Sequence, residues 1–387
     1  MVITATIQLL KDLKVRINDM SLNADIIRGD EKAVFSLRSL YSSFGFKQFR
    51  MSKFEEYDLY VKNKDFLVSN EVITFTDGSG KLLALKPDVT LSIIKNSRDC
   101  GDKIQKVYYD ENVYRTTKGN KEFREIMQTG LECIGNIGAY EVAEVVLLAL
   151  KSLEEITDDF VLDISYMDII LSVLSDSGLD SQQTSKILKA IGEKNTDEIK
   201  KICAEKNIDA DRIISLVTIN GKYESVLENL EKLCVTYNEK SHLNTFKKIL
   251  TFLCNSGYAD KINVDFSIVN NMNYYNGVVF QGYVNNIPSS ILSGGQYDNL
   301  MLKMGRKDKA VGFAVYLDLL QRYNNTEKQF DVDYILLKKD EDDISVISKS
   351  VADLKKENAS VLVQNEIPEN IKYRKAFKIT EEGVKEI

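Results

Sequence analysis

Two long segments of β-type composition, separated by a short polar loop, constrain the fold of this 387-residue chain more than any other feature. The segments are KVYYDENVYR (106–115) and FREIMQTGLECIG (123–135), and the polar stretch TTKGNKE connects them. Aromatic and β-branched side chains on both sides of a polar connection favour two antiparallel strands. We therefore expect an antiparallel sheet at the centre of the fold.

The chain before this pair alternates between helical and extended patterns. Residues 31–43 place apolar side chains at helical spacing and end near Gly45, whereas residues 46–60 predict an extended segment. The β-formers of EVITFT (71–76) and KLLAL (81–85) flank the turn DGSG, and this arrangement predicts a hairpin.

Helices are expected on both sides of the strand pair. Residues 90–97 predict a helix with Thr90 as its N-terminal cap, and a long apolar helix is expected from Tyr140 to Ile156. Residues 166–260 then change character, because short amphipathic segments alternate with polar turns such as GEKNTDE. We interpret them as a helical insertion outside the sheet.

β-Type segments return after the insertion, at VDFSIV (264–269), GVVFQGYV (277–284) and SGGQYD (293–298). Residues 310–323 predict a strand or tight turn that enters a helix, and QRYNNTEKQ is expected to be a linker.

The final residues contain VDYILL, ISVISKSVADLKKEN and SVLVQN, which predict one βαβ unit. The expected fold class is therefore α+β. We expect a core over residues 1–325, with the helical insertion at about 166–260, and a small C-terminal α/β domain over 331–387.

The composition is that of an ordinary globular protein, with 44% hydrophobic and 28% charged residues. No apolar run approaches the roughly 18 residues that a membrane-spanning helix needs. The first residues, MVITATIQLLKDLK, lack the basic start and cleavage site of a secretory signal peptide. We expect a cytoplasmic protein that has no membrane partner.

Neither a metal centre nor a nucleic-acid surface is indicated. The five cysteines form no CxxC pair and His242 is the single histidine, whereas a structural zinc site needs about four grouped ligands. We expect buried, reduced thiols and no metal or other cofactor. The net charge is −7, whereas nucleic-acid-binding proteins usually carry a basic excess, and this argues against tRNA as a partner.

Three blocks occur in an order that resembles a known family. The blocks are FTDGSGKLLALKPDVT (75–90), VYRTTKGNKEFREIMQTGLECIG (113–135), and a third that comprises NMNYYNGVVFQGY, SGGQYDNL and AVGFAVYLDLL (within 271–320). In order and approximate spacing they are similar to the core of class II histidyl-tRNA synthetases, over roughly residues 30–322. The resemblance implies that family's fold, an antiparallel sheet with flanking helices that activates an amino acid with ATP.

Most positions that the resemblance assigns to ATP chemistry are altered. The synthetases surround the reacting phosphate and carboxylate with arginines, because preorganised positive charge stabilises the transition state. One of these arginines is retained, as Arg115. The others fall at Glu122, at Asn270 and, in the family pattern G-x-E-R, at Leu319, where Asp318 replaces the glutamate; an ATP-contacting glutamate falls at Thr117.

These changes predict that the chain has no catalytic residues. Each lost donor of this kind lowers the rate by about 10²–10³, so several losses leave no useful ATP chemistry. The alternative is that this chain aligns with the synthetase motifs one or two residues out of register. Arg124 or Arg306 would then take the place of a missing arginine.

The positions that the resemblance assigns to the amino acid are largely kept. It implies Asp88 and Thr90 for the ammonium, Gln128 and Glu132 on one strand face, and Tyr275 and Tyr297 for the imidazole, with Gly294 and Gly295 allowing close approach. A carboxylate can bind the ammonium and Glu132 can accept from a ring N–H. Arg115, Gln128 or backbone amides would serve the ligand carboxylate. The expected histidine-binding set is Asp88, Thr90, Arg115, Gln128, Glu132, Tyr275 and Tyr297.

Simpler interpretations of these residues stay open. Asp88 also fits a helix cap, and buried tyrosines are usual in protein cores. The function is open in the same way. An active synthetase would need the missing arginines and an anticodon domain, for which residues 331–387 are short. An amino-acid-binding paralogue with another partner is also compatible with the sequence.

A retained amino-acid pocket beside an altered ATP site resembles the family of ATP phosphoribosyltransferase regulatory subunits. That resemblance implies a non-catalytic subunit that assembles with a short-form catalytic transferase subunit. It further implies histidine as a feedback effector in the first step of histidine biosynthesis, and a homodimer at the core of the assembly.

Overall fold

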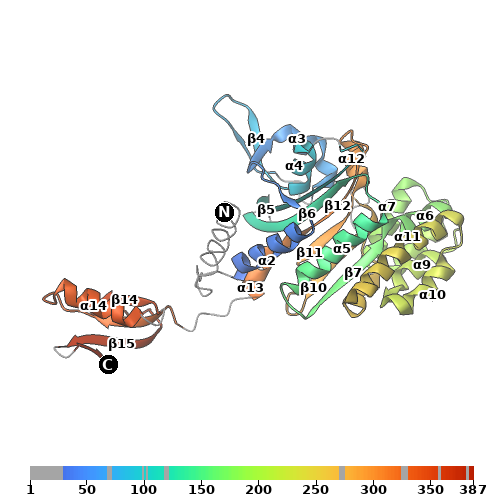
Figure 1. The fold of residues 1–387 in the computed structure, drawn as a ribbon. Helices are drawn as coiled ribbons and strands as arrows, with labels where there is room; N and C mark the ends of the chain where they lie inside the picture. The colour runs from blue at the N-terminus through green and yellow to red at the C-terminus, as the bar shows by residue number, and fades with distance from the viewer. Residues whose placement is uncertain are drawn as a thin grey trace, which may run out of the picture. The chain divides into compact units, whose positions relative to one another are not determined.

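The computed structural model describes residues 29–67, 72–97, 100–101, 103–116, 122–269, 275–323, 330–355, 359–380 and 383–387. The chain divides into two compact units, residues 1–324 and 325–387. In the described residues, the first unit contains a nine-stranded and a three-stranded sheet with their helices, and the second contains a four-stranded sheet (Figure 1).

The nine-stranded sheet has the strand order β1-β5-β6-β12-β11-β10-β7-β9-β8. Its strands are β1 (Lys47–Gln48), β5 (Ile104–Thr116), β6 (Phe123–Gly135), β7 (Phe160–Tyr166), β8 (Asn220–Gly221), β9 (Ile262–Asp265), β10 (Asn276–Val284), β11 (Leu292–Gln296) and β12 (Lys309–Tyr316). Neighbours pair antiparallel except β1 with β5 and β7 with β9. The predicted antiparallel pair is confirmed as β5 and β6.

The two faces of this sheet carry separate hydrophobic clusters, because side chains alternate along each strand. Leu131 and Cys133 of β6 belong to the cluster formed with α2 (Gly29–Ser43) and α5 (Ala139–Glu154). Ile134 belongs to the other cluster, which contains residues of α4 (Val89–Asn96) and α12 (Asp298–Lys303). Figure 1 shows α2 and α5 lying along the sheet, as the predicted helices at 31–43 and 140–156 require.

The segment at 46–60 differs from the expected extended conformation. It contains β1, then β2 (Phe54–Glu56), and becomes helical in α3 (Tyr57–Lys62). The side chain of Tyr60 is buried with that of Phe66 in the cluster on the α4 side. This tertiary packing favours a helical turn over the local extended pattern.

The predicted hairpin is confirmed in its described part. β3 (Thr74–Thr76) and β4 (Leu82–Leu85) pair antiparallel, and β2 adds to the other edge of β4. The helix that follows begins one residue earlier than expected, at Val89, and its cap is Asp88 rather than Thr90. Asp88 Oδ1 accepts a hydrogen bond of 2.9 Å from the Leu91 N–H, which satisfies a donor at the helix start.

The expected insertion is helical, with one correction. It contains α6 (Met167–Asp176), α7 (Ser181–Gly192), α8 (Thr196–Glu205), α9 (Asp211–Thr218), α10 (Tyr223–Leu233), α11 (Tyr237–Leu253), a π-helical turn (Cys254–Tyr258) and a 3₁₀ turn (Ala259–Lys261). Its short strand β8 pairs with β9 at the edge of the large sheet. The expectation that the insertion lies wholly outside the sheet was therefore wrong. The insertion connects β7 with β9, which are parallel neighbours.

The chain after the insertion forms β9 at 262–265, slightly before the expected segment 264–269. Ser267 donates through its N–H and its hydroxyl to Asp265 Oδ1, and these bonds turn the chain away from the strand. The segment 310–323 is resolved in favour of a strand, because β12 runs directly into α13 (Leu317–Tyr323).

The second unit contains the predicted βαβ unit as β13 (Val332–Leu337), α14 (Ile344–Leu354) and β14 (Val361–Gln364). Two strands that the sequence analysis did not predict follow it, β15 (Tyr373–Thr380) and β16 (Gly383–Glu386). β15 pairs parallel with β13 and antiparallel with β16, which gives the order β14-β13-β15-β16.

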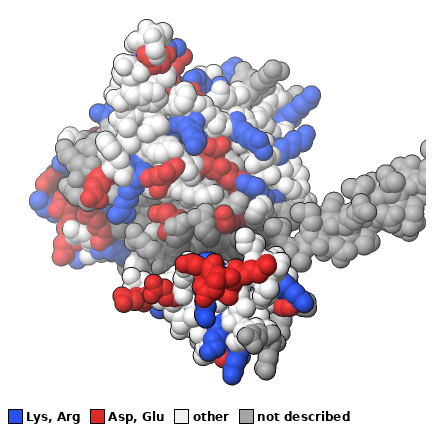
Figure 2. All heavy atoms as spheres, turned by 90° about the vertical axis from the view of Figure 1, so that its left-hand side faces the viewer, with Lys and Arg blue, Asp and Glu red and all other residues white. Residues whose placement is uncertain are grey.

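The surface charges and the cysteines of the described residues are distributed as follows. Figure 2 shows acidic side chains gathered in a patch in the lower part of the view and basic and acidic side chains mixed over the rest of that face. Cys133, Cys203 and Cys234 are buried, as expected, whereas Cys100 and Cys254 are partly exposed, and none of the five is in a disulfide. Within the described ranges, no helix combines the length and apolar character needed to cross a membrane, and no three His, Cys, Asp or Glu side chains are grouped to hold a metal ion.

Candidate functional site

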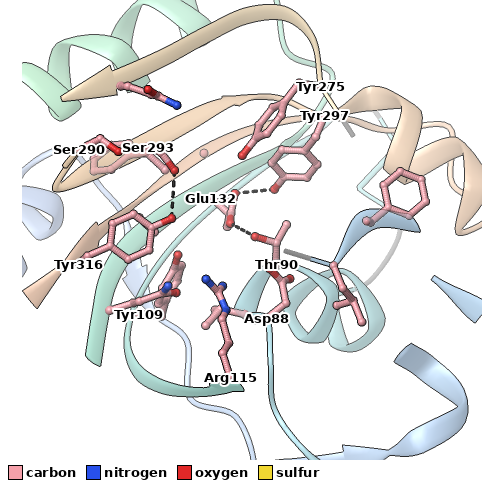
Figure 3. A pocket seen from close by; sticks show the side chains of 18 residues that line it. Asp88, Thr90, Tyr109, Arg115, Glu132, Tyr275, Ser290, Ser293, Tyr297 and Tyr316 are labelled. Atoms are coloured by element: carbon pink, nitrogen blue, oxygen red, sulfur yellow. Dashed lines mark hydrogen bonds between the residues drawn. The ribbon is translucent and has the colours of Figure 1, made fainter. Parts of the chain in front are cut away.

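A cavity of about 470 Å³ lies on the face of the large sheet that α4 covers. Strands β5, β6, β10, β11 and β12 and the start of α4 supply most of its lining (Figure 3). The structure brings the whole predicted binding set to this cavity, which is lined by Asp88, Thr90, Arg115, Gln128, Glu132, Tyr275 and Tyr297 among others.

The register of β6 and β12 sets the floor of the cavity. Across these strands the floor has three facing pairs, Glu132–Gly312, Gly130–Ala314 and Gln128–Tyr316. The outer pairs are four residues apart along each strand, about 13 Å at about 3.3 Å per residue. At the central pair Ala314 lines the cavity, and the Tyr109 hydroxyl lies over Gly130, 2.6 Å from where a Cβ at that position would be.

Glycines are required where these side chains approach the backbone. A Cβ atom at position 312 would lie 1.7 Å from Glu132 Oε2, and one at position 295 would lie 2.6 Å from the Tyr275 ring. Gly294 behaves differently, because a Cβ there would meet Phe313 and Phe280 of the opposite hydrophobic cluster. Neither of the two glycines expected to admit a ligand is among the described residues that line the cavity, and Gly295 instead allows close approach of the Tyr275 ring.

Glu132 is a buried acid of the site, with 2% of its surface exposed. Its Oε1 accepts a hydrogen bond of 2.8 Å from Thr90 Oγ1, and its Oε2 accepts one of 2.5 Å from the Tyr297 hydroxyl (Figure 3). Burial raises the pKa of Glu132 to about 8, and the two hydrogen bonds oppose that rise. Thr90 was expected at the ligand ammonium, and the structure places its hydroxyl on Glu132 instead.

Asp88 combines the two roles that the sequence left open. It caps α4 through Oδ1 and it also lines the cavity. Burial raises the pKa of this carboxyl, whereas the backbone N–H of Leu91 and the nearby Arg115 guanidinium lower it. A second acid therefore lies beside Glu132 and contributes to the raised pKa of that carboxyl, and a cation bound at this end would favour the ionised form of both acids.

Arg115 is the basic residue in the lining that the structure describes. Its Nε donates a hydrogen bond of 2.9 Å to the Pro87 carbonyl, and its guanidinium points into the cavity (Figure 3). Gln128 is 3% exposed, and its Nε2 has no hydrogen-bond partner within the described parts of the chain. A buried donor without an acceptor is unfavourable by about 1–3 kcal/mol, so this amide is arranged to donate to a ligand.

A network around Asp298 holds the strands that carry the two predicted tyrosines. Asp298 accepts hydrogen bonds from Asn276 Nδ2 (3.0 Å), Gln296 Nε2 (2.8 Å) and the Ala310 N–H (3.0 Å). Its own N–H donates to Asn276 Oδ1 at 2.7 Å. These bonds join the start of β10, next to Tyr275, to the end of β11, next to Tyr297.

Of the altered arginine positions, the two that the structure describes, Glu122 and Leu319, do not line the cavity. Glu122 is exposed just before β6, and Leu319 of α13 packs against the cluster on the α5 side. Asn270 and Thr117 lie outside the described residues. The register-shift alternatives also lie elsewhere, because Arg124 is exposed and Arg306 is buried against Asp308 at 2.5 Å.

The sequence analysis missed several residues that line the cavity, namely Tyr109, Gln281, Ser290, Ser293 and Tyr316. The hydroxyls of Tyr316 and Ser293 are 3.1 Å apart and hydrogen-bonded. A signal for Tyr316 was present, since it falls at the glycine of the pattern G-x-E-R. The others follow from strand register, which is not readable from sequence before the pairing is known.

Comparison with known proteins decides the family. The family model described as histidyl-tRNA synthetase matches residues 23–320. The chain belongs to this family. Among curated relatives, the ATP phosphoribosyltransferase regulatory subunit of Clostridium kluyveri is 28% identical over 306 residues, which cover 76% of this chain and 78% of that protein.

Solved structures of the family share the fold. A regulatory subunit/histidyl-tRNA synthetase from Bacillus halodurans superposes with a TM-score of 0.72 at 23% identity, covering 87% of this chain and 88% of that one. A chain of the ATP phosphoribosyl transferase (HisG:HisZ) complex from Thermotoga maritima has a TM-score of 0.60 at 21% identity, covering 74% of this chain and 97% of that one. The predicted class II synthetase-like α+β fold is therefore confirmed.

Proposed function

We propose that this chain is a non-catalytic regulatory subunit of ATP phosphoribosyltransferase and that it binds free histidine in the cavity. The observation that carries the proposal is a cavity lined by the whole predicted binding set, in a synthetase fold whose arginine positions are occupied by Glu122, Asn270 and Leu319. The name of the Clostridium kluyveri relative supports the same function. The free thiols fit a reducing, cytoplasmic location.

The imidazole ring of histidine is assigned to the Glu132 end of the cavity. Each carboxylate oxygen of Glu132 already accepts one hydrogen bond and has a further lone pair for a ring N–H. Tyr275 and Tyr297 line the same end and supply aromatic surface. Asp88, beside Glu132, is assigned to the ligand ammonium through a charge-assisted bond.

The ligand carboxylate is assigned to Arg115 and Gln128. Arg115 supplies positive charge in the described lining, and Gln128 supplies the buried Nε2 donor that has no partner there. Together they replace the arginine that the family carries at the position of Asn270. This arrangement binds a zwitterion, with cationic and anionic groups of the ligand each facing the opposite charge.

Regulation requires a partner that carries the transferase chemistry. We infer a short-form catalytic subunit as that partner, without tRNA, and a two-fold homodimer of this chain built on α2 and the strand after it. α2 leaves Phe35 59% exposed, as a side chain that a second subunit would cover. Histidine then acts by its different affinities for two states of the assembly.

The test combines the purified chain with a short catalytic subunit and measures phosphoribosyl-ATP formation during a histidine titration. We expect activity in the mixture, inhibition by histidine, and loss of that inhibition in Glu132→Ala. Substrates should weaken histidine binding by the same factor by which histidine weakens theirs, about 5–150-fold. Failure to form a complex would favour the amino-acid-binding paralogue with another partner, and a strictly monomeric chain in sedimentation would contradict the homodimer.

A further inference from the structure

Tyr316 closes one end of the cavity and is held there at several points. It is the last residue of β12 and faces Gln128 across the sheet. Its N–H donates to the Ile291 carbonyl at 2.8 Å, which fixes its backbone. Its hydroxyl bonds Ser293 Oγ at 3.1 Å, which fixes the ring.

The Tyr316 ring leans over the floor of the cavity rather than away from it. Ser293 faces Ala314, which lies two residues nearer the Glu132 end than Tyr316 does. The bond from the phenol to Ser293 therefore draws the ring back toward Glu132. Figure 3 shows Tyr316 and Ser293 joined across the side of the cavity opposite Tyr297.

The position of Tyr316 has a consequence for the ligand carboxylate. With the ring of histidine at Glu132 and its carboxylate at Arg115 and Gln128, the carboxylate points toward Tyr316. A group attached through that carboxylate would have to pass the phenol. The family pattern G-x-E-R has a glycine at this position, which leaves the same space free.

The polar groups at this end are poorly suited to a phosphate. Gln281, Ser290, Ser293 and Tyr316 are neutral, and Arg115 is the described basic residue in the lining. A phosphate-linked extension would add negative charge where the one basic side chain of the described lining, Arg115, is already assigned to the ligand carboxylate and the remaining partners are neutral and partly exposed.

We propose that Tyr316 determines specificity by ending the ligand site beyond the carboxylate, so that the cavity accepts a free amino acid and rejects derivatives extended through the carboxyl group. Acyl nucleotides, the products of amino-acid activation, are the extended class that Tyr316 excludes. The proposal rests on the proposed function, because it takes the histidine orientation given above.

The experiment measures binding of two ligands by calorimetric titration to the full chain. One is histidine, and the other is a non-hydrolysable sulfamoyl analogue in which adenosine is joined to the histidyl carboxyl group. The variants are Tyr316→Ala, which removes the ring, and Tyr316→Phe, which removes only the hydroxyl. Tyr114→Ala is the matched control, since Tyr114 is a half-buried tyrosine of the same sheet that does not line the cavity.

We expect the wild-type chain to bind histidine and to bind the analogue at least about tenfold more weakly. Tyr316→Ala should gain at least about tenfold in affinity for the analogue relative to histidine, whereas Tyr316→Phe and Tyr114→Ala should stay selective. Thermal unfolding of each variant reports whether it is folded. If Tyr316→Ala does not fold, Tyr316→Phe still tests the proposal, because a gain in affinity for the analogue in Tyr316→Phe would contradict exclusion by the bulk of the ring.

The outcomes separate this inference from the proposed function. If the wild-type chain binds histidine and the analogue equally, or if Tyr316→Ala gains nothing for the analogue, Tyr316 does not set specificity while the histidine site stands. If the wild-type chain binds neither ligand, the histidine site itself is wrong and the inference is overturned with it.

Discussion

Glu132 occupies the space that a side chain at position 312 would need, because a Cβ on Gly312 would lie 1.7 Å from Glu132 Oε2. We predict that Gly312→Ala displaces the carboxylate and weakens histidine binding by at least about tenfold, the value of one charged hydrogen bond. Overpacking should also lower the free energy of unfolding by about 1–3 kcal/mol. Calorimetric titration and chemical denaturation measure the two effects.

The control for this substitution is Gly78→Ala, since a Cβ at position 78 meets nothing within 4 Å. It should leave both quantities unchanged. Wild-type histidine affinity in Gly312→Ala would show that the position of Glu132 is not needed for binding.

Two substitutions distinguish the role of Asp88 as the cap of α4 from its role as a charged partner of the ligand. Asparagine caps helices about as well as aspartate, so Asp88→Asn should keep the stability of α4 while weakening histidine binding about tenfold or more. Asp88→Ala should weaken binding similarly and also lose about 1 kcal/mol of stability. Calorimetric titration measures the histidine affinity and chemical denaturation measures the free energy of unfolding. Equal histidine affinity in wild type and Asp88→Asn would show that Asp88 caps the helix but does not bind the ligand through its charge.

The role of Arg115 can be tested by changing the ligand. Histidinol has the ring and ammonium of histidine but no carboxylate, so wild type should bind it more weakly than histidine. Arg115→Ala should lose about tenfold or more in histidine affinity and little in histidinol affinity. A double-mutant cycle that combines Arg115→Ala with the change from histidine to histidinol measures the coupling energy between Arg115 and the ligand carboxylate. Equal losses for both ligands would show that Arg115 acts on the structure and not on the carboxylate.

The free energy of unfolding should fall as pH rises through the titration of Glu132. Burial raises the pKa of this carboxyl from 4.5 to about 8, so between these values the folded chain holds a proton that the unfolded chain has released. Stability therefore decreases with pH over this window. Asp88, whose pKa burial also raises, acts in the same direction.

Glu132→Gln tests this assignment because the amide has a similar shape and does not titrate. Its stability relative to wild type should increase from about pH 5 to about pH 8, measured by urea denaturation at several pH values. Parallel curves for the two proteins would mean that the carboxyl of Glu132 has an ordinary pKa.

We predict no histidine-dependent exchange of pyrophosphate into ATP. Leu319 is packed in the hydrophobic cluster on the α5 side and Glu122 is exposed, so neither supplies charge to the cavity. Leu319→Arg alone should not restore exchange, since residues that act as a unit are not additive. A robust exchange signal from the pure wild-type chain would contradict the non-catalytic assignment.

The sequence was informative where a pattern is local. The β5–β6 pair, the hairpin of β3 and β4 and the helical insertion follow from alternation, turn residues and helical spacing. The helix α3 was missed because it is stabilised by tertiary packing, namely the burial of Tyr60, which the local sequence pattern does not show. The strands β15 and β16 were missed although their residues alternate, because the βαβ pattern before them already accounted for a small domain.

The site divides in the same way. The binding set was predicted by matching motifs, and the structure places all its members around one cavity. Sequence could not show that the Thr90 hydroxyl bonds Glu132, because that contact joins α4 to β6. Nor could it pair Tyr316 with Gln128, which depends on the register of strands far apart in the chain.

The parallel pairing of β7 and β9 has a consequence for the order in which the chain folds. Asn263 Nδ2 donates to Asp163 Oδ1 at 2.9 Å across a separation of 100 residues, and closing so long a loop costs conformational entropy. The helices α7, α8 and α9 contact one another, so these local contacts can form before that loop closes. Backbone amides of α7–α9 should therefore gain protection from hydrogen exchange earlier during refolding than those of β9.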